Sequence, residues 1–401
     1  MNSVDRVLRA VLRRDASLFR EDLESCGPAL KDQIRGCRVL VIGAAGSIGS
    51  AFVKQLVGYA PGSLHLVDIS ENNLVEVVRD LRSSPVVLPE DFRTFAVAMG
   101  SAEFDRLLGS QGPYEYVVNF SALKHVRSEK DPFSLMRMYN TNVFYVKRLL
   151  SSLAGAGIRK HFSVSSDKAA NPANIMGATK IFMERILLSH SVRIPFSTAR
   201  FANVAFSDGS LLHGFVQRLA KRQPLAAPND VKRYFISHEE AGQLCLLACF
   251  LGENRDVFFP KLDEKEDVMT FSEIAGIFLE LMGYEAVPCA SEEEAKRMAA
   301  EMPADSKKWP CYFFESDTTG EKPFEEFYTD ADTVDWKRYR NIGVISQPLW
   351  TDQLRIDQAL AAFERIKRME RWRKEDMVEA IRIIVPELDH EEKGRNLDQK
   401  M

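Results

Sequence analysis

The stretch CRVLVIGAAGSIG, Cys37–Gly49, decides the fold of this chain. It begins as a continuous apolar run and ends in three glycines, at positions 43, 46 and 49. The apolar run predicts a buried strand, and the glycines permit a tight turn with close backbone approach. A helix that begins at this turn would point its N-terminus at a diphosphate.

A second apolar run, SLHLVDIS at 63–70, places Asp68 at the end of the next predicted strand, about twenty residues on. A carboxylate there accepts hydrogen bonds from the adenosine ribose hydroxyls and repels a 2′-phosphate. No Arg follows in DISENN, so the pattern favours NAD over NADP. The alternative is that the glycines only form a structural turn.

The sequence after Cys37 alternates short apolar strands with amphipathic helices. EYVVNFSAL at 115–123 and KHFSVSS at 160–166 are further strands, and ENNLVEVVRDLR and TNVFYVKRLLSSL are helical. Short buried strands that alternate with helices predict an α/β fold with a doubly wound parallel sheet.

The chain divides into four predicted parts. The pattern predicts a helical N-terminal extension and a dinucleotide-binding Rossmann domain to which parts of the later chain return. A smaller α/β substrate-binding lobe and a charge-dense helical C-terminal extension follow. The bounds are 1–36, 37–205, 206–330 and 331–401, with helices expected at 211–222, 239–251, 271–283, 291–301, 353–373 and 375–384.

Composition excludes several classes of protein. The net charge of −4 over 401 residues gives no basic field for nucleic acid. The six cysteines lack metal-ligand spacing, so we expect no metal site and a reducing cytoplasm. No run reaches the roughly 18 apolar residues of a membrane span, and the first twenty residues are charged, so we expect neither a membrane span nor a signal peptide.

The segment SVSSDKAANPANIMGATK, 163–180, carries the candidate chemistry. Ser166, Asp167 and Lys168 place a hydroxyl, a carboxyl and an amine side by side. An adjacent acid and base suit an elimination, in which one takes a proton while the other protonates a leaving hydroxyl. The alternative is an ion pair on a solvated loop.

Met176 and Lys180 stand in the spacing of the Tyr-x-x-x-Lys pair of short-chain dehydrogenases. With Ser-Asp-Lys-Ala before them, the segment resembles the extended short-chain dehydrogenase/reductases, specifically the nucleotide-sugar 4,6-dehydratases of the polysaccharide-biosynthesis type. One branch of that family has Met where Tyr is usual. The resemblance covers about residues 37 to 330. It implies a cofactor, a substrate and a role for each of the matching residues.

For catalysis, the resemblance implies that Lys168 is the base that removes the proton from C5 of the sugar. It implies that Asp167 is the acid that protonates the departing hydroxyl of C6. Ser166 would hydrogen-bond the C4 oxygen, and Lys180 would bind the nicotinamide ribose. The thioether of Met176 cannot accept the C4 hydroxyl proton. Either Asp167 takes that proton, or a water molecule takes it by way of Ser166, or the protein is inactive.

For binding, the resemblance implies two groups of residues. The cofactor group contains the three glycines, Asp68 and Lys180 already named, together with Ser47, Ile48, Ser121, Ala122 and Lys124. The substrate group contains Lys124, His125, Asn203, Arg233 and Glu321. Met99 and Thr318 depart from the family pattern, which usually has Asp and Arg there, and Asn142 matches a structural Asn.

The implied function is that of a hydro-lyase. The family norm is UDP-N-acetylglucosamine 4,6-dehydratase, which gives a 4-keto-6-deoxy sugar by C4 oxidation, loss of water across C5 and C6, and hydride return to C6. The Met-bearing branch favours retention at C5. A homo-oligomer is expected. The alternatives are a nucleotide-sugar epimerase on the same fold and an inactive NAD-binding sensor or scaffold.

Overall fold

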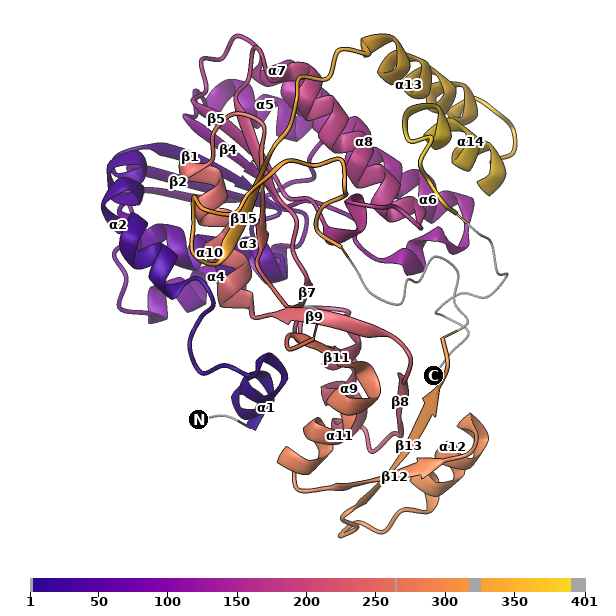
Figure 1. Ribbon diagram of the computed structural model, residues 1–401. Helices are drawn as coiled ribbons and strands as arrows, with labels where there is room; N and C mark the ends of the chain where they lie inside the picture. The colour runs from indigo at the N-terminus through magenta and orange to yellow at the C-terminus, as the bar shows by residue number, and fades with distance from the viewer. Residues whose placement is uncertain (1–2, 264, 317–325, 391–401) are drawn as a thin grey trace.

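A nine-stranded sheet forms the centre of the molecule (Figure 1). The computed structural model describes residues 3–263, 265–316 and 326–390. Seven strands are parallel, and two antiparallel strands close one edge, so the predicted doubly wound α/β fold is confirmed. In spatial order the strands are β14 (Val334–Asp335), β15 (Ile342–Ser346), β10 (Asp256–Pro260), β6 (Phe196–Ala199), β5 (Lys160–Ser163), β4 (Tyr116–Asn119), β1 (Arg38–Ile42), β2 (Ser63–Asp68) and β3 (Asp91–Ala96).

Helices cover both faces of this sheet because its strands are apolar on both sides. Along β1, Val39 and Val41 belong to one apolar core, and Leu40 and Ile42 belong to the other. The first core is covered by α2 (Arg20–Ile34), α3 (Ser47–Leu56), α4 (Glu71–Ser83) and α10 (His238–Leu251). The second is covered by α5 (Ala102–Gln111), α6 (Pro132–Tyr139), α7 (Tyr145–Leu153) and α8 (Ile175–His190).

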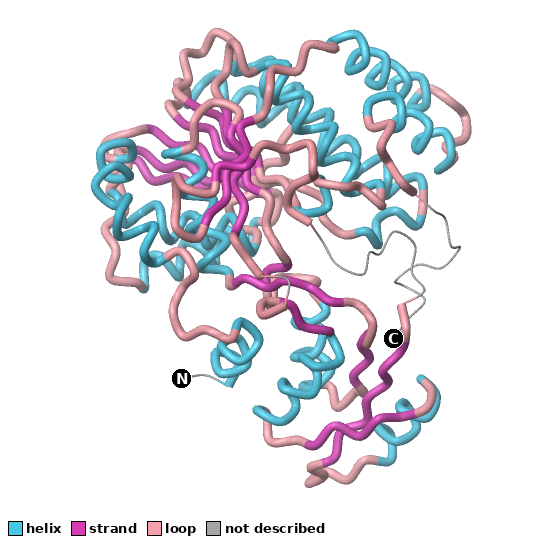
Figure 2. The backbone as a smooth tube through the Cα atoms, viewed as in Figure 1, coloured by secondary structure: helices cyan, strands magenta, loops and turns pink. Residues whose placement is uncertain are grey.

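A smaller lobe lies beside the main sheet and carries two three-stranded sheets (Figure 2). One consists of β7 (Asn203–Val204), β9 (Lys232–Ile236) and β11 (Val268–Thr270), and the other of β8 (Leu225–Pro228), β13 (Lys308–Phe314) and β12 (Glu285–Cys289). Its helices are α9 (Leu211–Ala220), α11 (Phe271–Leu281) and α12 (Glu292–Glu301). Short single-turn helices occur at Val57–Tyr59, Val126–Lys130, Asn140–Phe144 and Asp167–Ala169.

The N-terminal helices contact both parts of the molecule. α1 (Ser3–Leu12) packs on α11 in the lobe, and α2 packs on α10 over the main sheet. Arg14, between them, makes a two-point ion pair with buried Glu240, with N–O distances of 2.7 and 2.8 Å. Both helices and the turn between them thus pack within the chain.

The later chain returns to the main sheet at more than one point. α10 and β10, from the segment predicted as substrate lobe, complete the sheet and its covering layer. The prediction of a helical extension over 331–401 is wrong at its start, because β14 and β15 pair with the sheet edge there. The apolar residues of β15 provide the physical reason, since Ile342, Val344 and Ile345 are buried.

Two helices follow these strands, α13 (Gln353–Lys367) and α14 (Lys374–Ile384), and both pack on α8. Among the residues described, no helix is long and apolar enough to cross a membrane.

Candidate active site

The glycine-rich turn between β1 and α3 forms a close backbone junction. Gly43 has a φ of +71°, and a Cβ added there would lie 2.6 Å from the Ser121 amide nitrogen. A Cβ at Gly49 would lie 2.1 Å from the Gly43 carbonyl oxygen. Both positions therefore require glycine. The helix N-terminus at Gly46 has no side-chain cap, so its amides remain available to an anion.

A cleft of about 630 Å³ opens beside this turn. Its walls come from the ends of β1, β2, β3 and β4. It brings together five of the predicted cofactor residues: Gly43, Gly46, Asp68, Ser121 and Ala122. Ser47, Ile48, Gly49 and Lys124 do not line it, and the Ser47 hydroxyl instead accepts the Asp208 amide at 3.1 Å. The shape and the glycine turn fit a dinucleotide.

Asp68 also organises the turn itself. Its Oδ2 accepts the Ala45 amide at 2.9 Å, and its Oδ1 accepts the Ser70 amide at 2.9 Å. The carboxylate is thereby fixed at the end of β2, where each oxygen keeps a further lone pair for a ligand hydroxyl.

Ser166, Asp167 and Lys168 are in direct contact at the end of β5. The Ser166 hydroxyl donates to Asp167 Oδ1 at 2.8 Å. Lys168 Nζ lies 3.3 Å from Oδ1 and 3.5 Å from Oδ2 of the same carboxylate. The Asp167 side chain is 4% exposed and that of Lys168 is 18% exposed, so the pair is largely enclosed rather than on a solvated loop.

The first turn of α8 packs directly against this segment. Asn174 Oδ1 caps the helix by accepting the Gly177 amide at 2.8 Å. A Cβ at Gly177 would lie 2.3 Å from the Lys168 carbonyl oxygen, so the two segments meet backbone to backbone. Met176 is buried in the core that α8 shares with α6, and its amide donates to Glu129 Oε1 at 2.8 Å.

Lys180, one turn further along α8, is buried with its ammonium near the catalytic segment. Its Nζ donates to the Val164 carbonyl at 2.9 Å. Burial lowers the pKa of Lys180 to about 8, and the charge of Glu184 opposes this shift.

Asn142 joins α8 to the end of β4. Its amide nitrogen donates to the Thr179 hydroxyl and to the Leu123 carbonyl, both at 3.0 Å, and its oxygen accepts the Leu123 amide at 2.9 Å. It lies in the π-helical turn Asn140–Phe144, a distortion that often occurs at functional sites. Asn142 thus holds the loop after β4 against the helix that carries Lys180.

A buried ion pair lies one helical turn from Lys180, and it was not predicted from the sequence. Arg200 donates from Nε and Nη2 to the two oxygens of Glu184, at 3.1 and 2.6 Å. Nη1 of Arg200 also donates to the Phe327 carbonyl at 3.0 Å, and the Ser165 hydroxyl donates to Glu184. The spacing of Lys180 and Glu184, one helical turn apart, indicates only that these two charged side chains are neighbours on the helix. It does not indicate the pairing with Arg200.

The predicted substrate residues lie on the lobe side of the catalytic segment. Asn203 is on β7 next to β9, which carries Arg233. Within the described part of the chain, the Asn203 amide nitrogen is buried and has no hydrogen-bond partner, as expected of a donor awaiting a ligand oxygen. Arg233 is 5% exposed and donates to the Lys232 carbonyl at 2.8 Å. Glu321, like Thr318, lies outside the described residues.

Lys124 and His125 extend from the end of β4 toward the lobe. A Cβ at Gly209 would lie 2.9 Å from the His125 ring, so the loop after β7 packs against this histidine. Neighbouring protein atoms lower the pKa of Lys124 by desolvation, and the charge of Asp208 opposes the shift. Both residues therefore lie between the glycine-rich turn and the lobe rather than in the dinucleotide cleft.

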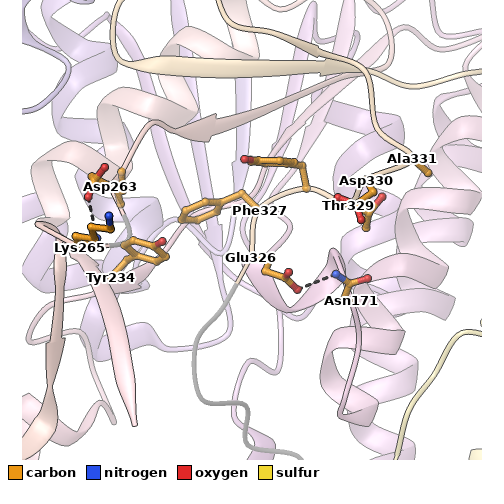
Figure 3. A pocket seen from close by; sticks show the side chains of 11 residues that line it. Asn171, Tyr234, Asp263, Lys265, Glu326, Phe327, Thr329, Asp330 and Ala331 are labelled. Atoms are coloured by element: carbon orange, nitrogen blue, oxygen red, sulfur yellow. Dashed lines mark hydrogen bonds between the residues drawn. The ribbon is translucent and has the colours of Figure 1, made fainter.

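A second cavity, of about 700 Å³, lies between the catalytic segment and the lobe (Figure 3). Asn171, three residues after Lys168, contributes one wall, and Tyr234 of β9 contributes another. The Asn171 amide donates to Glu326, another residue of the cavity wall, at 2.7 Å. The catalytic segment is therefore next to a space large enough for part of a substrate.

Comparison with known proteins identifies the family of this chain. A family model described as "Polysaccharide biosynthesis protein" matches residues 39–347. The chain belongs to this family. Its α/β fold is that of the extended short-chain dehydrogenase/reductases.

Three relatives show how far the similarity extends. An uncharacterized membrane protein of Methanocaldococcus jannaschii is 34% identical over 56% of this chain and 66% of its own length. The probable polysaccharide biosynthesis protein EpsC of Bacillus subtilis is 30% identical over 65% of this chain, but only 43% of its own length is matched. A UDP-N-acetylglucosamine 4,6-dehydratase (inverting) of Campylobacter jejuni is 25% identical over 57% of this chain and 67% of its own.

Among solved structures, Pen from Bacillus thuringiensis superposes with a TM-score of 0.64 at 21% identity. The superposition covers 79% of this chain and 89% of that protein. At this identity the superposition shows that the two proteins share a fold.

Proposed function

We propose that this protein is a nucleotide-sugar 4,6-dehydratase that uses NAD, with UDP-N-acetylglucosamine as its substrate. The observation that carries the proposal is the enclosed contact of Ser166, Asp167 and Lys168 after β5, next to β4, whose end lines the dinucleotide cleft. The similarity to the Campylobacter jejuni dehydratase supports the choice of substrate. A bound nicotinamide would accept hydride from C4 of the sugar and return it to C6.

In this proposal Ser166 and Asp167 handle the proton of the C4 hydroxyl. The Ser166 hydroxyl binds the C4 oxygen and passes a proton to Asp167 Oδ1, with which it already shares a 2.8 Å hydrogen bond. This route replaces the tyrosine of the wider superfamily, because Met176 is buried and offers no proton acceptor. Asp167 becomes a carboxylic acid, ready to protonate the departing C6 hydroxyl.

The same transfer prepares Lys168 to act as a base. While Asp167 is ionised, the ion pair at 3.3 Å favours the charged ammonium. Once Asp167 holds the C4 proton, that attraction disappears, and the partly exposed Lys168 can lose its proton to solvent. Neutral Lys168 then takes the C5 proton as Asp167 releases water from C6, and it later returns a proton to C5.

On the substrate side, Asn203 and Arg233 would hold the diphosphate. The unpartnered amide of Asn203 supplies one donor, and the guanidinium of Arg233 supplies a planar fork that suits phosphate oxygens. Lys180, buried behind the site, would bind the nicotinamide ribose.

An epimerase on the same fold is the nearest rival. It would return hydride to C4, and it would need no acid for a C6 hydroxyl. The contact between Asp167 and Lys168 therefore favours dehydration.

The proposed function is tested by incubating the protein and NAD with UDP-N-acetylglucosamine in deuterated water and recording proton spectra. We expect a 4-keto-6-deoxy sugar nucleotide that carries deuterium at C5, because Lys168 exchanges its proton with solvent before returning it. A control with Lys168→Ala should leave the sugar unchanged. Formation of the C4 epimer with an intact C6 hydroxyl would support the rival and overturn the proposal.

A further inference from the structure

Apolar side chains gather at one end of the dinucleotide cleft. Ile69 and Phe133 both line the cleft, and each is 70% exposed. Trp372 lines it as well, with its ring centroid 5.8 Å from that of Phe133. Large apolar groups exposed together inside a cleft indicate a surface that a ligand covers.

The sheet order identifies which end of the cleft this is. Asp68 ends β2 and Ile69 follows it, and residues 97–101 follow β3, at the far edge of the main sheet. The catalytic segment follows β5, on the other side of β1. Phe133 and Trp372 line the same cleft as Asp68 and residues 97–101, and no residue of 163–180 lines it. With Asp68 at the adenosine ribose, the aromatic rings therefore belong to the adenosine part of the site rather than to the part where hydride is transferred.

Trp372 reaches this position from the C-terminal helices. It lies between α13 and α14, which pack against α6 and α8 (Figure 1). Tyr139 of α6 stacks on Phe363 of α13, with centroids 3.5 Å apart and planes at 6°. This packing holds the segment that carries Trp372 against the helix that carries Phe133.

We propose that Phe133 and Trp372 form an aromatic clamp for the adenine base of the dinucleotide. The C-terminal helices are then part of the cofactor site rather than an appendage. Arg137, one turn after Phe133, lines the same cleft, and a guanidinium can stack on a base. This inference rests on the proposed use of a nicotinamide dinucleotide.

The test is a calorimetric titration of the intact protein, freed of bound nucleotide, with NAD and with ADP. Trp372→Ala should weaken both affinities by roughly tenfold, since a base stacked on an aromatic ring contributes about that factor or more. Trp372→Phe should bind within a few-fold of the wild type. Leu354→Ala is the matched control, because Leu354 is 68% exposed on α13 and does not line the cleft.

Fluorescence gives a second readout. NAD should change the tryptophan emission of the wild type, and this change should be lost in Trp372→Phe, which retains the other three tryptophans. Equal affinity of the wild type and folded Trp372→Ala for NAD and ADP would overturn the clamp and leave the proposed function standing. A wild-type protein that bound neither nucleotide would overturn both.

Discussion

Asp167→Asn is expected to lower turnover by roughly 10²–10⁴-fold while bound NAD is retained, because the amide can neither receive the C4 proton nor deliver one to C6. The substitution keeps the shape of the side chain and its contact with Ser166, so the fold should be unaffected. Turnover is measured from the 4-keto product, and NAD binding by calorimetry.

Lys168→Ala should give a loss of similar size for a different reason, since it removes the base at C5. Asp80→Asn serves as a control, because Asp80 forms an exposed ion pair with Lys54 on helices away from the catalytic segment. It should have wild-type turnover. Near-normal activity in either Asp167→Asn or Lys168→Ala would refute the assignment of acid and base.

Glu184→Ala is expected to destabilise the protein by about 3–5 kcal/mol, the cost of leaving a buried guanidinium without its partner. Glu184 and Arg200 are each less than a tenth exposed, and the ion pair links α8 to the chain at Phe327. Stability is measured from urea unfolding followed by circular dichroism.

The matched control for this prediction is Glu76→Ala. Glu76 and Arg79 form an ion pair on α4 whose side chains are both 70% exposed, so its loss should change stability by less than about 1 kcal/mol. Equal destabilisation by the two substitutions would contradict a structural role for the buried pair.

The glycine-rich turn and the catalytic segment could be predicted from sequence because their information is local. Gly43 and Gly49 are required by contacts within a few residues or with the neighbouring strand end. Ser166, Asp167 and Lys168 are consecutive, so their contact needs only the right turn at the end of β5.

Other features depend on packing between distant segments and could not be predicted. Glu184 and Arg200 lie on different elements, and nothing in their spacing indicates an ion pair. Trp372 meets Phe133 only because α13 and α14 fold back on α6 and α8. The strands at 334–346 were likewise hidden in a charge-dense segment, since β14 has two residues and β15 has five.

The contacts of the candidate binding residues could not be predicted from the sequence. Asn203 and Arg233 lie on neighbouring strands, and the hydroxyl of Ser47, a predicted cofactor residue, accepts a hydrogen bond from the Asp208 amide of the lobe. That bond joins the glycine-rich turn to the loop after β7. Such a contact between lobes has no local signature.

The most direct measurement of the central claim is a crystal structure of the protein with NAD and UDP-N-acetylglucosamine bound. The account predicts Lys168 Nζ facing C5 of the hexose and an Asp167 oxygen about 3 Å from the C6 oxygen. The hexose would then lie between these side chains and the nicotinamide. A structure in which Asp167 and Lys168 stay paired with each other and face away from the sugar would contradict it.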